Sequence, residues 1–210
     1  MAEDEKETIL KVIVLGSSQV GKTSVLLRYF KNEFNLETLS TIGIDFKTKY
    51  FKFDEDKVKI NFIDTAGQEK FRAISVNYLK GTDGVLLVFD ITNKETFDLI
   101  HNWVEDIHQN NKSNIGKILL GNKSDLEESR QVSKEDAEQL AKELGCQYIE
   151  ASAKTGENIN ETISEIAKLS YDYYKKLDES EKRRSIKLTK KNESNNNKKE
   201  EEQNKKKGCC

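Results

Sequence analysis

Apolar and polar positions alternate along the first 175 residues in a way that predicts strands separated by helices. Runs typical of buried or half-buried strands include residues 9–15, 58–63, 117–120 and 146–150. Between such runs, apolar residues recur three or four positions apart, as on one face of a helix. With six strand candidates alternating with helical patterns, the chain is expected to form an α/β fold: a doubly wound, mostly parallel six-stranded sheet with helices on both faces.

Capping signals predict the limits of two helices. Thr92-Asn93-Lys94-Glu95 reads as a capping box at the start of a helix whose apolar positions are Phe97, Ile100, Trp103, Val104 and Ile107. Ser133 is expected to begin another helix and Gly145 to end it. His101 and His108 fall on the first of these helices. We assign them to its packing and surface and expect no catalytic histidine.

The most informative chemistry follows the strand at residues 9–15. Residues 16–23 read Gly-Ser-Ser-Gln-Val-Gly-Lys-Thr and fit the phosphate-loop pattern G-x-x-x-x-G-K-[ST], unless they form only a structural glycine turn. A strand that turns through glycines into a helix directs backbone N–H groups and the positive helix end at one point, where a polyphosphate can bind. Lys22 can reach the β and γ phosphates, and the Thr23 hydroxyl can bind Mg²⁺. The candidate phosphate-binding residues are Gly16, Ser17, Ser18, Gln19, Val20, Gly21, Lys22, Thr23 and Ser24.

A second motif, Asp64-Thr65-Ala66-Gly67-Gln68-Glu69, follows the strand at residues 58–63. Asp64 suits holding Mg²⁺ through water. The Gly67 N–H could meet a γ-phosphate, and Gln68 could orient the water that attacks it. Asp64 alone could simply cap the following turn, but beside a phosphate loop the motif predicts a metal-dependent site.

Two later strands end in motifs that fit guanine. Asn122-Lys123-Ser124-Asp125 matches N-K-x-D, and Ala151-Ser152-Ala153-Lys154 follows the last strand. Asp125 offers two acceptor oxygens to the N1–H and exocyclic amine of guanine, a donor pair that adenine lacks. The stem of Lys123 could cover one face of the base, and the Ala153 N–H could meet its O6. Ligands of open α/β sheets gather at the carboxyl edge of the strands, so the four motifs predict one guanine-nucleotide site.

This order of motifs resembles the Ras superfamily of small GTPases over residues 9–176, and within it the Rab family, closest to its secretory branch. The segments that carry the Rab likeness are Ser40-Thr41-Ile42-Gly43-Ile44-Asp45-Phe46, Lys70-Phe71-Arg72, Tyr78-Leu79-Lys80-Gly81 and Leu87-Val88-Phe89-Asp90-Ile91-Thr92. The resemblance implies a P-loop NTPase fold of the small G-domain type. It also implies a GTP/GDP switch that hydrolyses GTP slowly and recruits effectors to membranes in vesicular trafficking.

The resemblance further implies roles for particular residues. Gln68 would act with Lys22 in catalysis. Thr41 would complete the Mg²⁺ shell only when the γ-phosphate is present, and Phe34 would stack edgewise on the base. The implied effector surface consists of Ile42, Gly43, Ile44, Asp45, Phe46, Ile63 and Tyr78.

Two positions depart from the Rab pattern. Gln19 stands where a small residue is usual, so nucleotide affinity or hydrolysis could differ. Ile63 stands where a Rab normally has tryptophan, which removes one ring from the aromatic partner surface. The implied partners are an exchange factor, a GTPase-activating protein, a GDP-dissociation inhibitor, Rab escort protein, a prenyltransferase and effectors.

The composition changes at residue 176, where the chain becomes rich in Lys, Glu, Asn and Ser. Residues 176–210 hold twelve Lys and Arg against seven Asp and Glu, a net charge of +5, which leaves about −7 for residues 1–175 of a chain at −2. An acidic domain argues against nucleic-acid binding, whereas a basic tail is attracted to anionic membranes, or serves only as a solubilising tail. We therefore expect a flexible N-terminus at residues 1–8, a GTP-binding domain at 9–175 and a disordered tail at 176–210.

The last residues are Lys205-Lys206-Lys207-Gly208-Cys209-Cys210. Lys207 stands where a C-a-a-X box needs cysteine. Tandem terminal cysteines resemble the double-geranylgeranylation site of Rabs, and two lipids are what stable anchoring requires. Cys146 is expected to be a buried strand residue, so no disulfide framework forms. With no signal-peptide pattern and no apolar run of about 20 residues, we expect attachment through Cys209 and Cys210 to the cytoplasmic face of an intracellular or plasma membrane, with a cytosolic pool.

Two other functions fit part of this pattern. A binding module could hold GTP without hydrolysing it and serve as a static membrane tag; Gln68 argues against this, and Gln19 leaves it open. A Ras- or Rho-type signalling GTPase is the other alternative. The two terminal cysteines and the Rab-like segments argue against it.

Overall fold

The computed structural model describes residues 7–35, 44–65, 77–110, 115–177 and 179. By its internal contacts the chain divides into two units, Met1–Tyr173 and Tyr174–Cys210, and the fold described below belongs to the first. Within the described stretches, no helix has the length and apolar character needed to cross a membrane.

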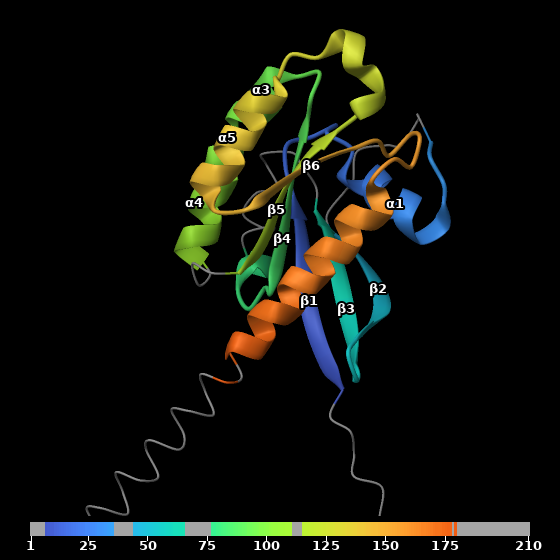
Figure 1. Ribbon diagram of the computed structural model, residues 1–210, viewed down its shortest axis with the longest axis vertical. Helices are drawn as coiled ribbons and strands as arrows, with labels where there is room; N and C mark the ends of the chain where they lie inside the picture. Colours follow the sequence, from blue (N-terminus) through green and yellow to red (C-terminus); the bar gives the residue numbers. More distant parts are fainter. Residues whose placement is uncertain (1–6, 36–43, 66–76, 111–114, 178, 180–210) are drawn as a thin grey trace, which may run out of the picture. The chain divides into compact units, whose positions relative to one another are not determined.

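The described strands form one six-stranded sheet in the order β2-β3-β1-β4-β5-β6 (Figure 1). Neighbouring strands are parallel except β2 and β3, which pair antiparallel. This arrangement confirms the predicted mostly parallel sheet. The bounds of the strands are β1 (Thr8–Leu15), β2 (Ile44–Phe53), β3 (Asp56–Thr65), β4 (Gly84–Asp90), β5 (Gly116–Asn122) and β6 (Gln147–Ala151).

Helices lie on both sides of the sheet, as Figure 1 shows. On one side are α3, α4 and α5, and on the other are α1 and a last helix. The last helix comprises residues 159–177, of which residues 159–173 belong to the first unit. The remaining bounds are α1 (Lys22–Lys31), α3 (Lys94–Asp98), α4 (Ile100–Asn110), the 3-10 helix η2 (Ser124–Ser129) and α5 (Lys134–Leu144).

The core follows the central strands. All residues of β4 are buried, because a parallel strand covered by helices on both faces needs apolar side chains on both. By contrast, β2 is an edge strand, and all of its residues are exposed or half-buried. The same layering buries Trp103 on α4 and leaves His101 and His108 exposed, as the helical pattern predicted.

Strand register brings the predicted motifs to one edge of the sheet. Val14 pairs with Asp64, so the phosphate loop and the second motif leave the sheet together. Asn122 pairs with Asp90 on one side and with Ala151 on the other. The two guanine motifs therefore leave the same edge, which is where open α/β sheets bind their ligands.

The predicted limits of α5 are confirmed. Ser133 caps the helix by accepting a hydrogen bond from the Asp136 N–H at 3.0 Å, and Gly145 ends it in a left-handed conformation with φ of 61°. Cys146 differs from its prediction, because it is half-buried and stands just before β6 rather than within the strand. Burial raises the pKa of its thiol.

The helix after β4 differs from the capping-box prediction. Asn93 is its N-cap, and the Asn93 side chain accepts a hydrogen bond from the Glu95 N–H at 3.0 Å. Thr92 instead donates both its N–H, at 2.9 Å, and its hydroxyl, at 2.7 Å, to the Asp90 carboxylate. Because Asp90 engages the threonine, the cap moves one residue along the chain. The helix is also in two parts, α3 and α4, which divide at Leu99.

Candidate nucleotide-binding site

The loop between β1 and α1 bends at its glycines. Gly16 has a φ of 148° and Gly21 of 93°, and Gln19 between them is left-handed with φ of 65°. A Cβ on Gly16 would lie 2.1 Å from the Val88 carbonyl oxygen, and one on Gly21 would lie 2.3 Å from Asn122 Nδ2. Both positions need glycine, because the loop packs directly on β4 and β5. Gln19 is exposed; the other loop residues are the buried Ser17 and Val20 and the half-buried Ser18, with Ser24 half-buried on α1.

Lys22 is the first residue of α1 and is almost fully buried, with 5 % of its surface exposed. Its Nζ donates to the carbonyl oxygens of Gly16, at 2.9 Å, and Ser17, at 2.8 Å. Burial lowers the pKa of Lys22 to about 8, and the charge of Asp64 only partly opposes this. The loop thus holds a desolvated ammonium group that phosphate oxygens would stabilise.

Asp64 is fully buried near the end of β3, and neither of its carboxylate oxygens has a hydrogen-bond partner in the described structure. Burial raises the pKa of this carboxyl, whereas the nearby Thr23 hydroxyl and Lys22 ammonium lower it. A buried carboxylate without a partner is unfavourable unless a cation or water meets it.

The two carboxylate oxygens of Asp64 are suitable ligands for Mg²⁺. Among the described residues there is no group of three or more His, Cys, Asp or Glu that could hold a metal. Among the described residues, a cation beside Asp64 would therefore depend on that carboxylate and the Thr23 hydroxyl, and its other ligands would come from the nucleotide, from water or from the predicted Thr41. Mg²⁺ keeps several waters and takes only one or two protein ligands together with substrate phosphates, which matches this sparse set.

Asn122 joins the phosphate loop to both guanine motifs. Its side chain is buried at the end of β5. Nδ2 donates to the Val20 carbonyl oxygen at 2.7 Å, and Oδ1 accepts from the Ala153 N–H at 3.2 Å. The Ala153 N–H, predicted to meet guanine O6, therefore already has an acceptor that a nucleotide would share or replace.

Asp125 and Lys123 are held by neighbouring segments. The Ser152 hydroxyl donates to Asp125 Oδ1 at 2.6 Å, and Lys154 Nζ lies 3.6 Å from Asp125 Oδ2. Lys123 is left-handed, with φ of 69°, and its Nζ lies 2.5 Å from Asp90 Oδ2. The structure thus brings Asp125 and Ser152 together. It also fixes the Lys123 side chain through an ion pair between its ammonium group and Asp90, the last residue of β4.

Two residues of this site were not singled out from the sequence. Arg28, on α1, donates from Nε to the Ala153 carbonyl oxygen at 2.8 Å and from Nη2 to that of Lys154 at 2.7 Å. Asp90 pairs with Lys123. No motif marks Arg28, whose partner Ala153 is 125 residues away. Asp90 belongs to one of the segments that resemble Rabs, and this resemblance could have indicated its role in the site.

The predicted effector surface is only partly exposed. Phe46 is 54 % exposed, and its ring centroid lies 5.8 Å from that of the half-buried Tyr78. The structure contradicts the predicted surface position of Ile63, which is 1 % exposed. The reason is that the last four residues of β3 are buried on both faces of the sheet. Of the neighbouring residues, Ile44 is half-buried and Asp45 is exposed.

Phe34 is half-buried in the segment after α1. The other predicted residues lie outside the described residues, and their roles stay predictions: Thr41, Ile42, Gly43, Gly67, Gln68, Cys209 and Cys210.

Comparison with known proteins places the chain among GTPases. Residues 11–172 match the family described as Ras family. Ras-related protein Rab-8B of Bos taurus is 44% identical over 160 residues, which cover 76% of this chain and 77% of that protein. Ras-related protein Rab-1 of Theileria parva is 45% identical over 169 residues, 80% of this chain and 77% of that protein. GTP-binding protein ypt2 of Schizosaccharomyces pombe is 41% identical over 168 residues, 80% of this chain and 84% of that protein.

The family match covers the sheet from Lys11 onward and every described motif of the site. The chain therefore belongs to the Ras family of small GTPases, as a Rab of the secretory branch that binds GTP and GDP, hydrolyses GTP and acts as a switch in membrane trafficking.

Proposed function

We propose that residues 9–175 form the GTP-binding domain, and that the nucleotide lies along the carboxyl edge of β1, β3, β5 and β6. The observation that best supports this is the placement of Asn122, which contacts the phosphate loop at Val20 and the last motif at Ala153. A nucleotide bound across both segments would place its phosphates at the phosphate loop and its base at the last motif. The Asn122 side chain already joins these two segments.

Guanine is the base that this pocket would select. Asp125 would accept hydrogen bonds from N1–H and the exocyclic amine, and Ser152 already holds the carboxylate from the side of β6. The stem of Lys123 and the ring of Phe34 would flank the base. Adenine would leave the carboxylate without its donors, at a cost of about 1–3 kcal/mol or more.

The phosphates would bind the backbone N–H groups of residues 16–24 and the ammonium of Lys22. Thr23 would hold Mg²⁺ directly, Asp64 would hold it through water, and Thr41 would join them in the GTP state. When bound, Mg²⁺ would neutralise charge that develops on the β and γ phosphate oxygens.

Hydrolysis would use Gln68 to orient the attacking water and Lys22 to stabilise charge on the phosphates. A GTPase-activating protein would supply a further positive charge, worth roughly 10³–10⁵ in rate among related GTPases. Loss of the γ-phosphate would release Thr41 and the Gly67 N–H, and so change the two segments that partners read. The implied partners are an exchange factor, a GDP-dissociation inhibitor and effectors, the last binding near Phe46 and Tyr78.

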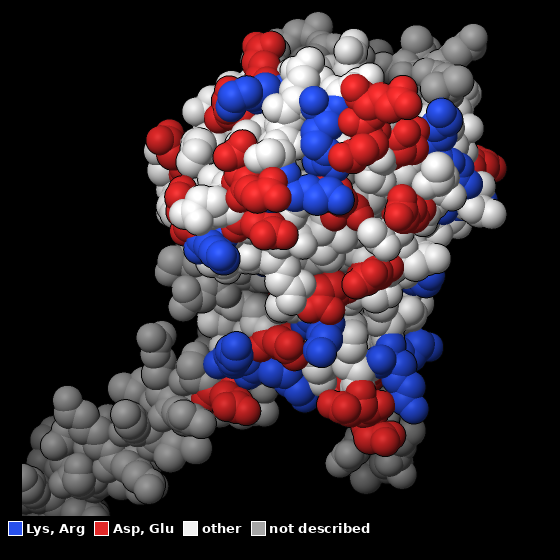
Figure 2. Space-filling model, turned by 45° about the horizontal axis from the view of Figure 1, so that its top comes forward, with Lys and Arg blue, Asp and Glu red and all other residues white. Residues whose placement is uncertain are grey.

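Membrane attachment would depend on the tail at residues 176–210. On the face shown in Figure 2, acidic and basic side chains of the described residues are interspersed. Residues 1–175 carry a net charge of about −7 and the tail one of +5, so attraction to an anionic leaflet would come from the tail. Rab escort protein and a prenyltransferase would add lipids to Cys209 and Cys210, and two chains give stable anchoring where one is marginal.

Asp125→Asn tests the assignment of the base pocket. The substitution replaces one acceptor oxygen with a donor, so affinity for GTP should fall by about 10²-fold while affinity for xanthosine triphosphate rises. Equilibrium binding of both nucleotides measures this. Asp136→Asn, on the exposed first turn of α5, is the matched control and should bind as the parent does. An Asp125→Asn protein that still prefers GTP as strongly as the parent would show that the base binds elsewhere.

A further inference from the structure

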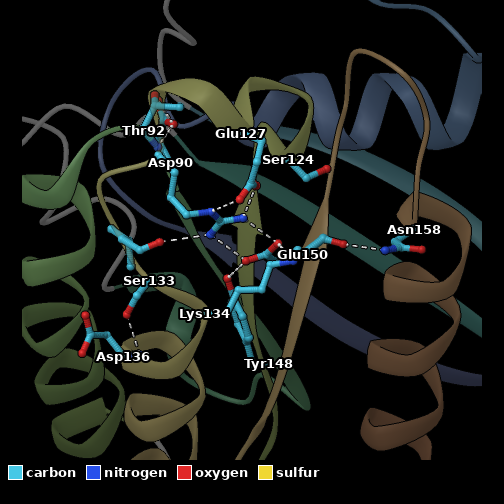
Figure 3. A network of polar contacts seen from close by, with 12 residues as sticks. Asp90, Thr92, Ser124, Glu127, Ser133, Lys134, Asp136, Tyr148, Glu150 and Asn158 are labelled. Atoms are coloured by element: carbon cyan, nitrogen blue, oxygen red, sulfur yellow. Dashed lines mark hydrogen bonds and ion pairs between the residues drawn. The ribbon is translucent and has the colours of Figure 1, made fainter.

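Arg130 follows η2 directly, and its guanidinium bonds to Glu127 of η2 and to Glu150 of β6. Figure 3 shows these two glutamates on their separate elements. Nε and Nη2 donate to the Glu127 carboxylate at 2.8 and 2.6 Å. Nη1 and Nη2 donate to the Glu150 carboxylate at 2.9 Å each. Nη1 also donates to the Val132 carbonyl oxygen at 3.0 Å. One side chain therefore forms two bidentate pairs with carboxylates on different elements, the strongest and most directional arrangement that arginine makes.

The pair with Glu150 is shielded from solvent, since both side chains are only 14 % exposed. Glu150 also accepts from the Tyr148 hydroxyl at 2.6 Å, and Lys134 Nζ lies 3.5 Å away. Burial by itself would raise the pKa of Glu150, but the hydrogen bonds from Arg130 and Tyr148 outweigh it and lower that pKa. This carboxylate is thus charged, half-buried and satisfied on both oxygens, which rigidifies its surroundings.

The two carboxylates stand next to the residues that would read guanine. Glu127 is two residues after Asp125 on η2, and Glu150 is two residues before Ser152. Ser152 and Asp125 meet through a single hydrogen bond of 2.6 Å. The guanidinium therefore links the same two segments, η2 and the end of β6, through residues two positions away from that contact. This link limits how far the two segments can separate.

The same network packs against β5. Gly121, which immediately precedes Asn122, pairs with Glu150 in the sheet. A Cβ on Gly121 would lie 2.7 Å from the Tyr148 hydroxyl oxygen. The polar cluster therefore lies against the end of β5, next to Asn122, whose neighbour in the sheet is Ala151, the residue before Ser152.

We infer that Arg130 is a positioning residue for guanine recognition: by joining η2 to β6, it holds the Asp125 carboxylate where it meets the exocyclic amine of the base. The inference rests on the proposed nucleotide site. It predicts an effect on the choice of base, whereas an arginine that merely stabilises the fold would affect all bases alike.

Inosine diphosphate separates these two roles, because its base keeps N1–H and O6 but lacks the exocyclic amine. In the parent protein we expect IDP to dissociate on the order of tenfold faster than GDP, the loss of one hydrogen bond to a charged acceptor. Arg130→Met keeps an unbranched apolar side chain and removes every donor. It should speed GDP release about tenfold and IDP release much less, so that the ratio of the two rates falls toward one.

Dissociation of fluorescent GDP and IDP is followed by stopped flow on the full chain in Mg²⁺. Lys94→Met is the control, because it removes the exposed Lys94–Asp98 pair on α3 and should leave both rates and their ratio unchanged. Arg130→Lys keeps the charge but not the two bidentate pairs, so it should fall between the parent and Arg130→Met. If Arg130→Met does not fold, the comparison of Arg130→Lys with the parent tests the inference.

Two results would overturn the inference alone: Arg130 variants that speed the release of GDP and IDP by the same factor, or variants that change neither rate. A parent protein that released GDP and IDP equally fast would instead remove the assigned base pocket, and with it both the proposed function and this inference.

Discussion

The buried ammonium of Lys22 should make nucleotide binding depend on pH in a range where exposed lysines stay charged. Its pKa in the free protein is lowered to about 8 by burial. Phosphate charges beside Nζ would keep the group protonated in the complex. Below pH 8 the free protein already carries the proton, but above pH 8 it must take one up to bind. Affinity for GDP should therefore fall as the pH rises through 8.

The size of the effect follows from that pKa. Between pH 7 and pH 9 the free protein passes from mostly charged to about one-tenth charged, so GDP should bind about tenfold more weakly at pH 9, or about 1.4 kcal/mol. Equilibrium titration of nucleotide-free protein with fluorescent GDP at pH 7, 8 and 9 measures this directly.

Lys22→Met provides the comparison. It should bind GDP more weakly than the parent at every pH, and it lacks the group whose proton is at issue. Titration of the guanine base itself affects both proteins and cancels in their ratio. If the affinities of the parent and Lys22→Met changed with pH in parallel, Lys22 would not be a desolvated lysine and the reasoning from its burial would be refuted.

The same shift has a consequence for the stability of the free protein. Its folded pKa of about 8 lies below the unfolded value of 10.5, so between these values the unfolded chain binds more protons and the free energy of unfolding rises with pH. The full effect is about 3 kcal/mol, of which about 1.4 kcal/mol is reached by pH 9. Urea unfolding should show this rise in the parent relative to Lys22→Met.

Three further substitutions test the remaining roles. Thr23→Asn should weaken GTP binding more than GDP binding, and chelation of Mg²⁺ by EDTA should affect its GDP release less than that of the parent; equal losses for both nucleotides would argue against a metal role. Gln68→Leu should bind GTP as the parent does but hydrolyse it on the order of 10²-fold more slowly in single turnover, the typical effect of misplacing a reacting group; unchanged turnover would reject that role. Replacing both Cys209 and Cys210 with serine should move the protein from membrane to soluble fractions with GTP binding unchanged, whereas continued sedimentation would place the anchor elsewhere.

The sheet and the place of the site could be read from local patterns. The apolar run of β1 and the glycines that follow it lie within fifteen residues of one another, and both depend on backbone preferences that the residues themselves impose. The same holds for Ser133 and Gly145, whose capping roles involve only neighbouring residues. Once parallel strands are predicted, their carboxyl ends must share an edge, so the four motifs had to converge.

Two predictions failed because the folded chain makes contacts that the sequence pattern did not indicate. Thr92 was a plausible cap until Asp90 accepted its N–H and hydroxyl. Ile63 stands in a strand whose pattern alternates at its start, but packing on both faces covers its carboxyl end. In the first case a competing local contact displaced the predicted cap, and in the second the packing of other elements on the sheet outweighed the local pattern.

The sequence by itself determined the α/β fold and the position of the phosphate loop, and it predicted which residues face guanine, because each depends on periodicity or on short motifs with one stable backbone geometry. Only the tertiary structure decided how these residues are held. Arg28 reaches Ala153, Asp90 pairs with Lys123, and Arg130 joins Glu127 to Glu150. Apart from Arg130 and Glu127, which are three residues apart, the partners in these contacts are distant in the sequence. Charge-assisted hydrogen bonds form between them only after folding has brought the donor and acceptor atoms within about 3 Å.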